Sequence, residues 1–147
     1  MKIDAAQTRS RRTLQPVDYV ALANFRRALR QFLAFSDAVT GDAGVTAQQY
    51  QGLLAIKATP GAALSIKALA EELVLQHHGA VQLANRLEAA GLARRRPSAV
   101  DRRAVQLELT DRGEACVAEL AANHMEELRK HEPLLAQTLS YLRAIEP

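Results

Sequence analysis

The chain has 147 residues, of which 48% are hydrophobic and 24% charged, a composition typical of one ordinary globular domain. Alanine and leucine, with 28 and 21 residues, far outnumber glycine and proline, with 7 and 5, which favours helices. The single cysteine excludes an intrachain disulfide bond, and no apolar run approaches the ~20 residues that span a bilayer. The polar, basic N-terminus lacks a signal-peptide core, so we expect a cytoplasmic protein with no membrane partner.

The first third of the sequence predicts an arm and two helices. Residues 1–15 are polar and are expected to form a mobile N-terminal arm. Apolar residues then recur at steps of three and four, which predicts one long amphipathic helix that begins at Pro16 and ends before Gly41. The pair Thr46-x-x-Gln49 is a capping box, and it begins a second helix that stops before residue 60.

Two further helices are separated by very few residues. Ser65 is a good N-cap for a short third helix, and residues 74–76 leave only a tight turn before a fourth. The fourth helix is expected to run from about His77 to about Ala90, with small residues on its inward face. Gly91 follows at the place where a left-handed helix cap is expected.

The hydrophobic period changes after the fourth helix. Residues 104–109 alternate between apolar and polar side chains, which predicts a half-buried strand, and a partner strand fits at 92–96. The connection 97–102 makes the two strands a hairpin. Thr110 then caps a helix that we expect to run to about Lys130, and Pro133 is expected to open a separate last helix. The last helix carries a leucine-rich face that needs a partner surface, formed by Leu134, Leu135, Leu139, Leu142 and Ile145.

The order of short helix, tight turn, helix and β-hairpin predicts a winged helix-turn-helix, a mainly α fold with a small β-hairpin wing. We assign 46–110 to the winged DNA-binding region and 16–45 with 111–147 to N- and C-terminal dimerisation helices, all in one structural domain. The helix from His77 is narrow enough to enter a DNA major groove. Five arginines and one acid lie between Arg94 and Arg103, a local charge of 5 − 1 = +4 that suits phosphates or a narrow minor groove. The residues expected at the DNA from this pattern are Ser65, His77, His78, Val81, Gln82, Arg86, Arg94, Arg95, Arg96, Arg102 and Arg103.

Three segments together resemble the MarR (multiple antibiotic resistance regulator) family. They are NRLEAAGL at 85–92, DRR at 101–103 and LELT at 107–110, and Gly113 completes the family's pattern of D-x-R, a strand ending in L-T, and a glycine in the next turn. The resemblance extends over about residues 17–146. The sequence departs from it at His77-His78, where many relatives carry small hydroxyl residues or proline, and at Asn85, where aspartate is common.

The resemblance implies an obligate homodimer in which the first and last helices of two subunits interlock on a pseudo-palindromic DNA operator. It also implies a transcriptional regulator, usually a repressor, that a small anionic or phenolic ligand releases from DNA. By motif position, Arg103 would enter the minor groove, and Asp101 would orient the side chain of Arg103 or Arg96 by a charge-assisted hydrogen bond. Three arginines of the first helix, Arg26, Arg27 and Arg30, form a solvated face on the ordinary interpretation and a ligand-binding group on the functional one.

Other functions receive less support from the residues. A winged-helix protein-interaction module without DNA binding is the alternative, although such a module has no need of the arginine cluster. The sequence contains no catalytic motif, and we expect neither an enzyme nor a cofactor. His124, Glu127 and His131 could approach a metal ion on one helix face, but the sequence has no tight ligand cluster and we assign no metal site. Cys116 is interpreted as a small buried hydrophobic residue, with a redox-sensing thiol as the alternative.

Overall fold

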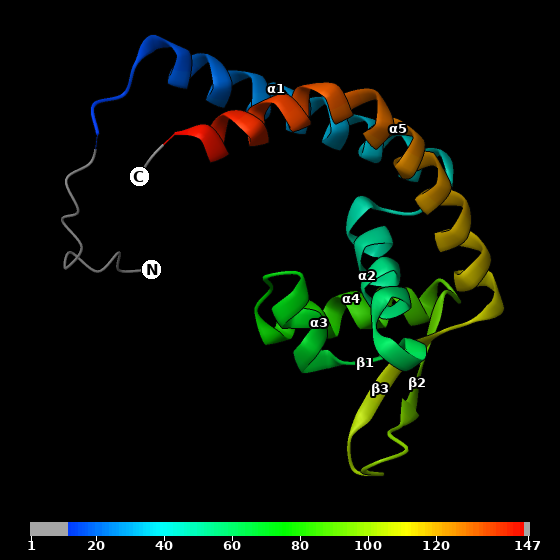
Figure 1. Ribbon diagram of the computed structural model, residues 1–147. Coiled ribbons are helices and arrows are strands. Elements are labelled where there is room, and N and C mark those ends of the chain that lie inside the picture. Colours follow the sequence, from blue (N-terminus) through cyan, green and yellow to red (C-terminus); the bar gives the residue numbers. More distant parts are fainter. Residues whose placement is uncertain (1–11, 146–147) are drawn as a thin grey trace. The chain divides into compact units, whose positions relative to one another are not determined.

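The computed structural model describes residues 12–145, so most of the predicted arm at 1–15 lies outside the described residues. Within these residues the chain forms five α-helices and three strands. The fold is mainly α with a small β-hairpin wing, as predicted (Figure 1). The elements are α1 (Pro16–Asp42), α2 (Ala47–Ala58), a single 3-10 turn (Pro60–Ala62), β1 (Ala63–Ser65), α3 (Ile66–Glu72), α4 (His77–Ala89), β2 (Ala93–Pro97), β3 (Val105–Leu109) and α5 (Asp111–Ala144).

The chain divides into two compact units. Among the described residues, one unit contains residues 12–33 and 128–145, and the other contains residues 34–127. Helices α1 and α5 each contribute one part to both units. We call these parts the helical unit and the winged unit. The hydrophobic core of the described residues lies in the winged unit, where its members run from Tyr50 to Leu120.

The winged unit is built around a three-stranded antiparallel sheet in the order β1-β3-β2. The largest completely buried side chains between the sheet and the helices include Leu53 and Ile56 of α2, Leu83 and Leu87 of α4, and Leu107 of β3. Their burial stabilises the position of α4 against both α2 and the hairpin. Strands β2 and β3 pair along their whole length, in a register that sets Arg94 opposite Glu108.

The predicted helix caps are present. Thr46 and Gln49 form the reciprocal capping box, with Thr46 N donating to Gln49 Oε1 at 2.8 Å and Gln49 N donating to Thr46 Oγ1 at 3.0 Å. Ser65 Oγ accepts the backbone N–H of Ala68 at 3.1 Å, which begins α3. Gly91 has φ +69°, the left-handed backbone that favours glycine after a helix.

Two expectations about the elements were wrong. Strand β1 was not predicted, because three residues are too few to show alternation and they form a strand only through pairing with β3. The two expected C-terminal helices are one helix, α5, which continues through Pro133. Proline removes one helical hydrogen bond, but Pro133 is exposed, so water can bind the carbonyl group that loses its partner. Smaller differences are that α1 extends through Gly41 to Asp42 and that β2 begins one residue later than predicted.

The junction between the sheet and α5 is unusually close. Thr110 N donates to Leu92 O at 3.1 Å, Thr110 Oγ1 donates to Gly91 O at 2.6 Å, and Gly113 N donates to Thr110 Oγ1 at 3.1 Å. A Cβ atom added to Gly113 would lie 1.9 Å from Leu92 O. Glycine at residue 113 therefore allows the first turn of α5 to lie directly on the start of β2.

Candidate DNA-binding surface

Helix α4 presents an outward face that is polar and largely unused by the fold. Its inward residues are buried, whereas His77, His78 and Gln82 are exposed and Val81 is half-buried. His77, His78 and Gln82 have no hydrogen-bond partner among the described residues. Further along the same face Arg86 Nη2 donates to Gln48 Oε1 at 2.6 Å, so the fold already engages this arginine. The side chains that remain available are therefore in the first half of α4.

The wing arginines on one face of the hairpin are paired with an acid that the sequence analysis did not single out. Glu108 accepts from Arg94 Nε at 2.6 Å, and its other oxygen lies 2.7 Å from Arg96 Nη1. Strand register explains the first contact, because Arg94 and Glu108 are directly opposed in β2 and β3. Glu108 thus offsets part of the positive charge that the sequence concentrates in this segment.

Arg95 points to the opposite face of β2 and joins the wing to α4. Its guanidinium pairs with Glu88 and donates to Asn85 Oδ1 at 2.8 Å. Its backbone N–H donates to Glu88 Oε1 at 3.1 Å. We refer to Arg95, Glu88 and Asn85 as the wing clamp, because together they connect the first strand of the hairpin to the C-terminal half of α4.

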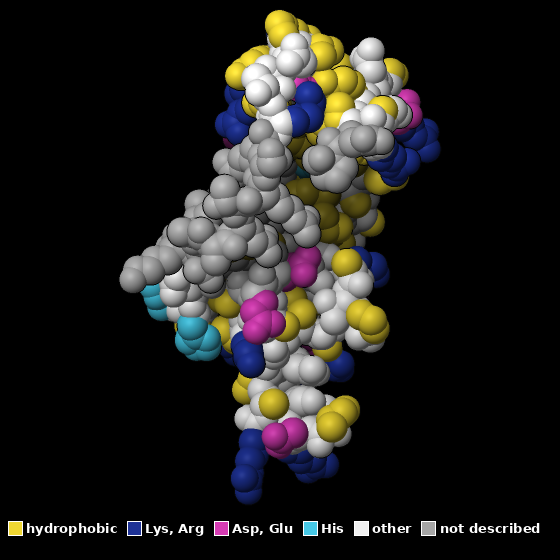
Figure 2. All heavy atoms as spheres, turned by 60° about the vertical axis from the view of Figure 1, so that its left-hand side comes forward, with side chains coloured by type: hydrophobic (Ala, Val, Ile, Leu, Met, Phe, Trp, Pro, Cys, Tyr) yellow, Lys and Arg dark blue, Asp and Glu magenta, His cyan; other side chains and the backbone are white. Residues whose placement is uncertain are grey.

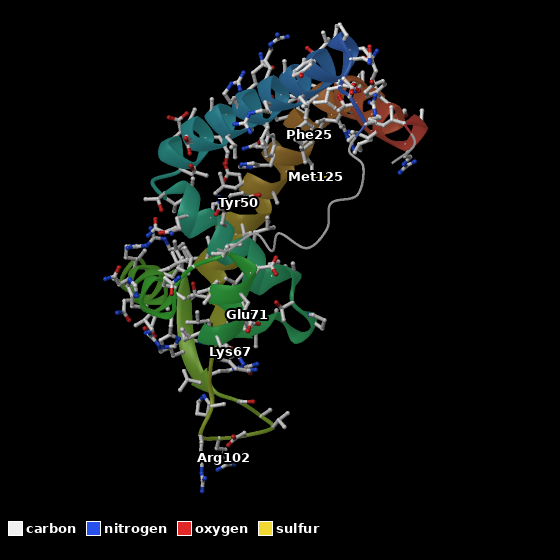
Figure 3. All side chains as sticks on the ribbon, turned by 90° about the vertical axis from the view of Figure 1, so that its left-hand side faces the viewer. Phe25, Tyr50, Lys67, Glu71, Arg102 and Met125 are labelled. Carbon is white, nitrogen blue, oxygen red and sulfur yellow. The ribbon has the colours of Figure 1, made fainter. Side chains whose placement is uncertain are left out.

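The tip of the hairpin carries the two wing arginines that have no partner among the described residues. Arg102 and Arg103 are exposed, and Figure 3 shows Arg102 at the tip, directed away from the sheet. Asp101 Oδ1 accepts the backbone N–H of Arg103 at 3.0 Å. The expected contact of Asp101 with an arginine side chain is therefore absent. Asp101 shapes the backbone of the turn instead, and Arg96 pairs with Glu108.

The unpaired positive charge of the hairpin consequently occupies a smaller region than the sequence indicated. Arg94, Arg95 and Arg96 are held by Glu108 and Glu88, so the unpaired cations concentrate at the hairpin tip. Figure 2 shows Lys and Arg side chains gathered at the lower end of the view, where the hairpin ends. Ser65, by contrast, is half-buried and its hydroxyl caps α3.

The helical unit holds an apolar groove between α1 and α5. Its volume is about 310 Å³. Phe25 and Leu22 of α1 and Leu139 and Leu142 of α5 line it and are exposed. Figure 3 labels Phe25 on the α1 side of this groove. None of the three candidate ligand residues, Arg26, Arg27 and Arg30, lines the groove; all three are exposed, and Arg27 contacts Asn24 at 3.4 Å.

A buried carboxylate, that of Asp18, is part of the lining of this groove. Asp18 accepts hydrogen bonds from the Tyr141 hydroxyl and from Gln15 N, the latter at 2.6 Å, and pairs with Arg12. The hydrogen bonds from Tyr141 and Gln15, together with the Arg12 charge, hold the pKa of Asp18 below its ordinary value. The same contact raises the pKa of Tyr141, because the phenolate would face the carboxylate. The start of α1 is thereby connected to the end of α5.

Two residues considered for metal or redox chemistry belong to the packing of the winged unit. His124 stacks on Tyr50 with ring centroids 4.3 Å apart, and its two ring nitrogens lie 2.6 Å from Leu120 O and 2.8 Å from Ser36 Oγ. Both nitrogens are thus already in hydrogen bonds. Cys116 is half-buried against the core, and burial, followed by the charge of Glu119, raises the pKa of its thiol despite Arg112.

Comparison with known protein families gives a match within the winged unit. Residues 43–104 match the model of the MarR family. This confirms the resemblance found in the sequence. Among curated protein sequences none matches the chain.

Solved structures of MarR-family proteins share the fold. The MarR-family transcriptional regulator AbsC from Streptomyces coelicolor is 20% identical, with a TM-score of 0.69 over 92% of this chain and 100% of that one. Wild-type MarR from E. coli is 19% identical, with a TM-score of 0.66 over 92% and 100%. The MarR-family transcription regulator SP03579 is 25% identical, with a TM-score of 0.71 over 86% and 84%. The chain thus has the fold of MarR-family transcriptional regulators.

The two acids that hold the wing arginines, Glu88 and Glu108, were missed as candidate functional residues. A signal for Glu108 existed in the sequence, because any hairpin that pairs 92–96 with 104–109 brings an acid opposite the arginines. No comparable signal pointed to Glu88, because its contact with Arg95 depends on how the hairpin packs on α4.

No helix within residues 12–145 is both long and apolar enough to span a membrane.

Proposed function

We propose that this protein is a homodimeric, sequence-specific DNA-binding transcriptional regulator, a repressor that a small anionic or phenolic ligand releases. The observation that carries the proposal is the pairing of an exposed, polar α4 face with two unpaired arginines at the wing tip, both in the winged unit. In a winged helix-turn-helix these two elements read the major groove and the adjoining minor groove. The MarR-family fold supports the same conclusion.

In this arrangement α4 enters the major groove with its N-terminal half leading. Gln76 precedes α4 without a side-chain cap, so backbone N–H groups of the first turn can bind a DNA phosphate. The wing follows the backbone to the minor groove, where Arg102 and Arg103 meet the strongest negative potential. Arg94 and Arg96, which Glu108 already neutralises in part, contribute less.

The DNA-binding proposal is tested by selecting bound fragments from a random DNA pool and titrating the enriched sequence by fluorescence anisotropy. We expect Arg103→Ala to weaken binding by about 1–3 kcal/mol and Arg102→Ala to weaken it in the same direction. The matched control is Arg143→Ala, which removes an exposed arginine of α5 in the helical unit. Failure to enrich any fragment would overturn the proposal and favour a protein-interaction module.

Dimerisation through the helical unit follows from its lack of a core. Among the described residues, eleven of the sixteen exposed large hydrophobic side chains belong to this unit, and the core cluster contains none of its residues. Exposed apolar surface of this extent marks an interface. We propose that residues 16–45 and 111–147 form the dimerisation region and 46–110 the DNA-binding region, with a second copy of the chain covering the α1–α5 groove.

The dimer is tested by light scattering at micromolar concentration. We expect a dimer for the wild-type chain and loss of the dimer, with aggregation or unfolding, for Leu139→Glu, which places a charge in the groove. The control Leu54→Glu changes an exposed leucine of α2 outside the groove. A stable, monodisperse wild-type monomer would overturn the proposal.

The effector is proposed to be an anion that Arg26 and Arg30 attract. These arginines are four residues apart on α1, so they lie on one helix face and create a local positive potential. Arg27 adds to this potential. Calorimetric titration of carboxylates and phenols, with and without operator DNA, should give a lower affinity for the DNA-bound dimer, because linkage is reciprocal. Equal affinities for a ligand that releases DNA would exclude the mechanism.

A further inference from the structure

We propose that Gln82 is the main base-reading residue of α4 and that it reads an adenine in each operator half-site. The inference rests on the proposed DNA-binding function and deepens it. The exposed face of α4 is the surface that would meet the bases, and a recognition helix contacts them mainly with its N-terminal residues.

The polar residues in the second half of α4 are already engaged. Asn85 Oδ1 accepts from Arg95 in the wing clamp, and Arg86 donates to Gln48 on α2 at 2.6 Å. Arg86 is the only arginine or lysine of α4, so the first two turns contain no such residue. Arginine and lysine make the commonest specific contact with guanine. This helix therefore lacks the usual guanine reader in its leading half.

Gln82 is the residue in that half with the right chemistry for a base pair. It is exposed, has no partner among the described residues, and lies opposite the buried residues Ala80, Leu83 and Leu87. Its amide offers one donor and one acceptor side by side, which matches N7 and N6 of adenine in the major groove. His78, four residues earlier on the same face, has one N–H when neutral and can reach one acceptor or a phosphate.

Two neighbouring features agree with an A·T-rich site. Val81 is half-buried beside Gln82 and offers an apolar surface to the methyl group of thymine. At the wing tip, the exposed Arg102 and Arg103 suit a narrow minor groove, which A-tracts provide. The helix and the wing thus favour the same class of DNA from independent contacts.

The test uses base analogues in the selected operator. Replacing one adenine at a time by 7-deazaadenine removes the N7 acceptor, and replacing it by purine removes the N6 amino group. At one adenine in each half-site, either change should weaken binding of the wild-type protein, by no more than the roughly 5-fold to 150-fold expected for a complete bidentate contact, because each change removes one of its two hydrogen bonds. The Gln82→Ala variant should be insensitive to both changes at that adenine. Gln51→Ala, at an exposed glutamine of α2, is the control and should respond as the wild type does.

A second variant tests specificity by gain. Gln82→Glu replaces the amide by an acceptor, which suits the N4 amino group of cytosine, so selection with this variant should replace the adenine by cytosine. If Gln82→Ala suffers the same losses as the wild type at every adenine, or Gln82→Glu selects the wild-type sequence, the assignment of Gln82 is overturned. The proposed function would survive that result, since it fails only if the wild-type protein enriches no DNA.

Discussion

Replacing Gly113 by alanine tests how closely the wing is joined to α5. The added Cβ would lie 1.9 Å from Leu92 O and 2.9 Å from Leu92 C, whereas real Cβ atoms essentially never approach closer than 3.0 Å. The backbones of α5 and β2 must therefore separate by at least 1.1 Å, the difference between 3.0 and 1.9 Å. Leu92 O also accepts the N–H of Thr110, so the separation breaks or lengthens this hydrogen bond.

The net cost follows from three contributions. Overpacking of this kind costs about 1–3 kcal/mol, and each hydrogen bond lost at the junction costs about 1 kcal/mol. Alanine regains about 1 kcal/mol of helix propensity. We expect Gly113→Ala to lower the free energy of unfolding by about 1–3 kcal/mol, measured by urea denaturation at fixed protein concentration, because dimerisation would make stability concentration-dependent.

Gly41→Ala is the matched control for this measurement. Gly41 also lies inside a helix, but an added Cβ would meet nothing within 4 Å. We expect this variant to equal or exceed the wild type in stability, by up to about 1 kcal/mol. If the two variants had equal free energies of unfolding, the close contact between residue 113 and Leu92 O would be refuted.

Two further predictions concern titratable groups. Because the pKa of Asp18 is below its ordinary value of 3.8 in the folded protein, its contribution to stability is present above pH 3.8 and is lost as the pH falls through the lowered pKa. NMR titration should show this depressed pKa in the wild type and a higher one in Tyr141→Phe; an unchanged pKa would remove Tyr141 as its main cause. The Cys116 thiol, half-buried and with a raised pKa, should react slowly with a disulfide reagent at pH 7 and rapidly in urea, and fast reaction of the folded protein would revive the redox alternative.

The sequence was sufficient for features that depend on neighbouring residues. The capping box at Thr46, the cap at Ser65 and the left-handed Gly91 are local, so residue type and spacing predict them. The hairpin was also predictable, because alternation along one strand reports which face is buried. These features were enough to predict the winged helix-turn-helix and the family resemblance.

Features that depend on distant residues were not predictable in the same way. Helix α5 continues through Pro133 because this residue is exposed to solvent. The residue type predicts a helix break and gives no information about its exposure. The charge cluster is the clearest example, since counting arginines gave one uniform patch. Packing divides it into arginines held by Glu88 and Glu108 and arginines that remain unpaired at the tip. Only the three-dimensional partners of each arginine separate the two groups.

This division of the arginines can be measured on operator DNA. An arginine that contacts a phosphate contributes to the slope of log affinity against log salt, about 0.9 for each contact, whereas an arginine that only positions the wing does not. Arg95 is occupied by Glu88 and Asn85, so we expect Arg95→Met to weaken binding without changing the slope. Glu88→Gln should behave in the same way, because it weakens the same clamp. Loss of an unpaired tip arginine, in Arg102→Ala, should reduce the slope by about 0.9. A reduced slope in Arg95→Met would show that Arg95 leaves the clamp to bind DNA, and the clamp would then not be what holds the wing.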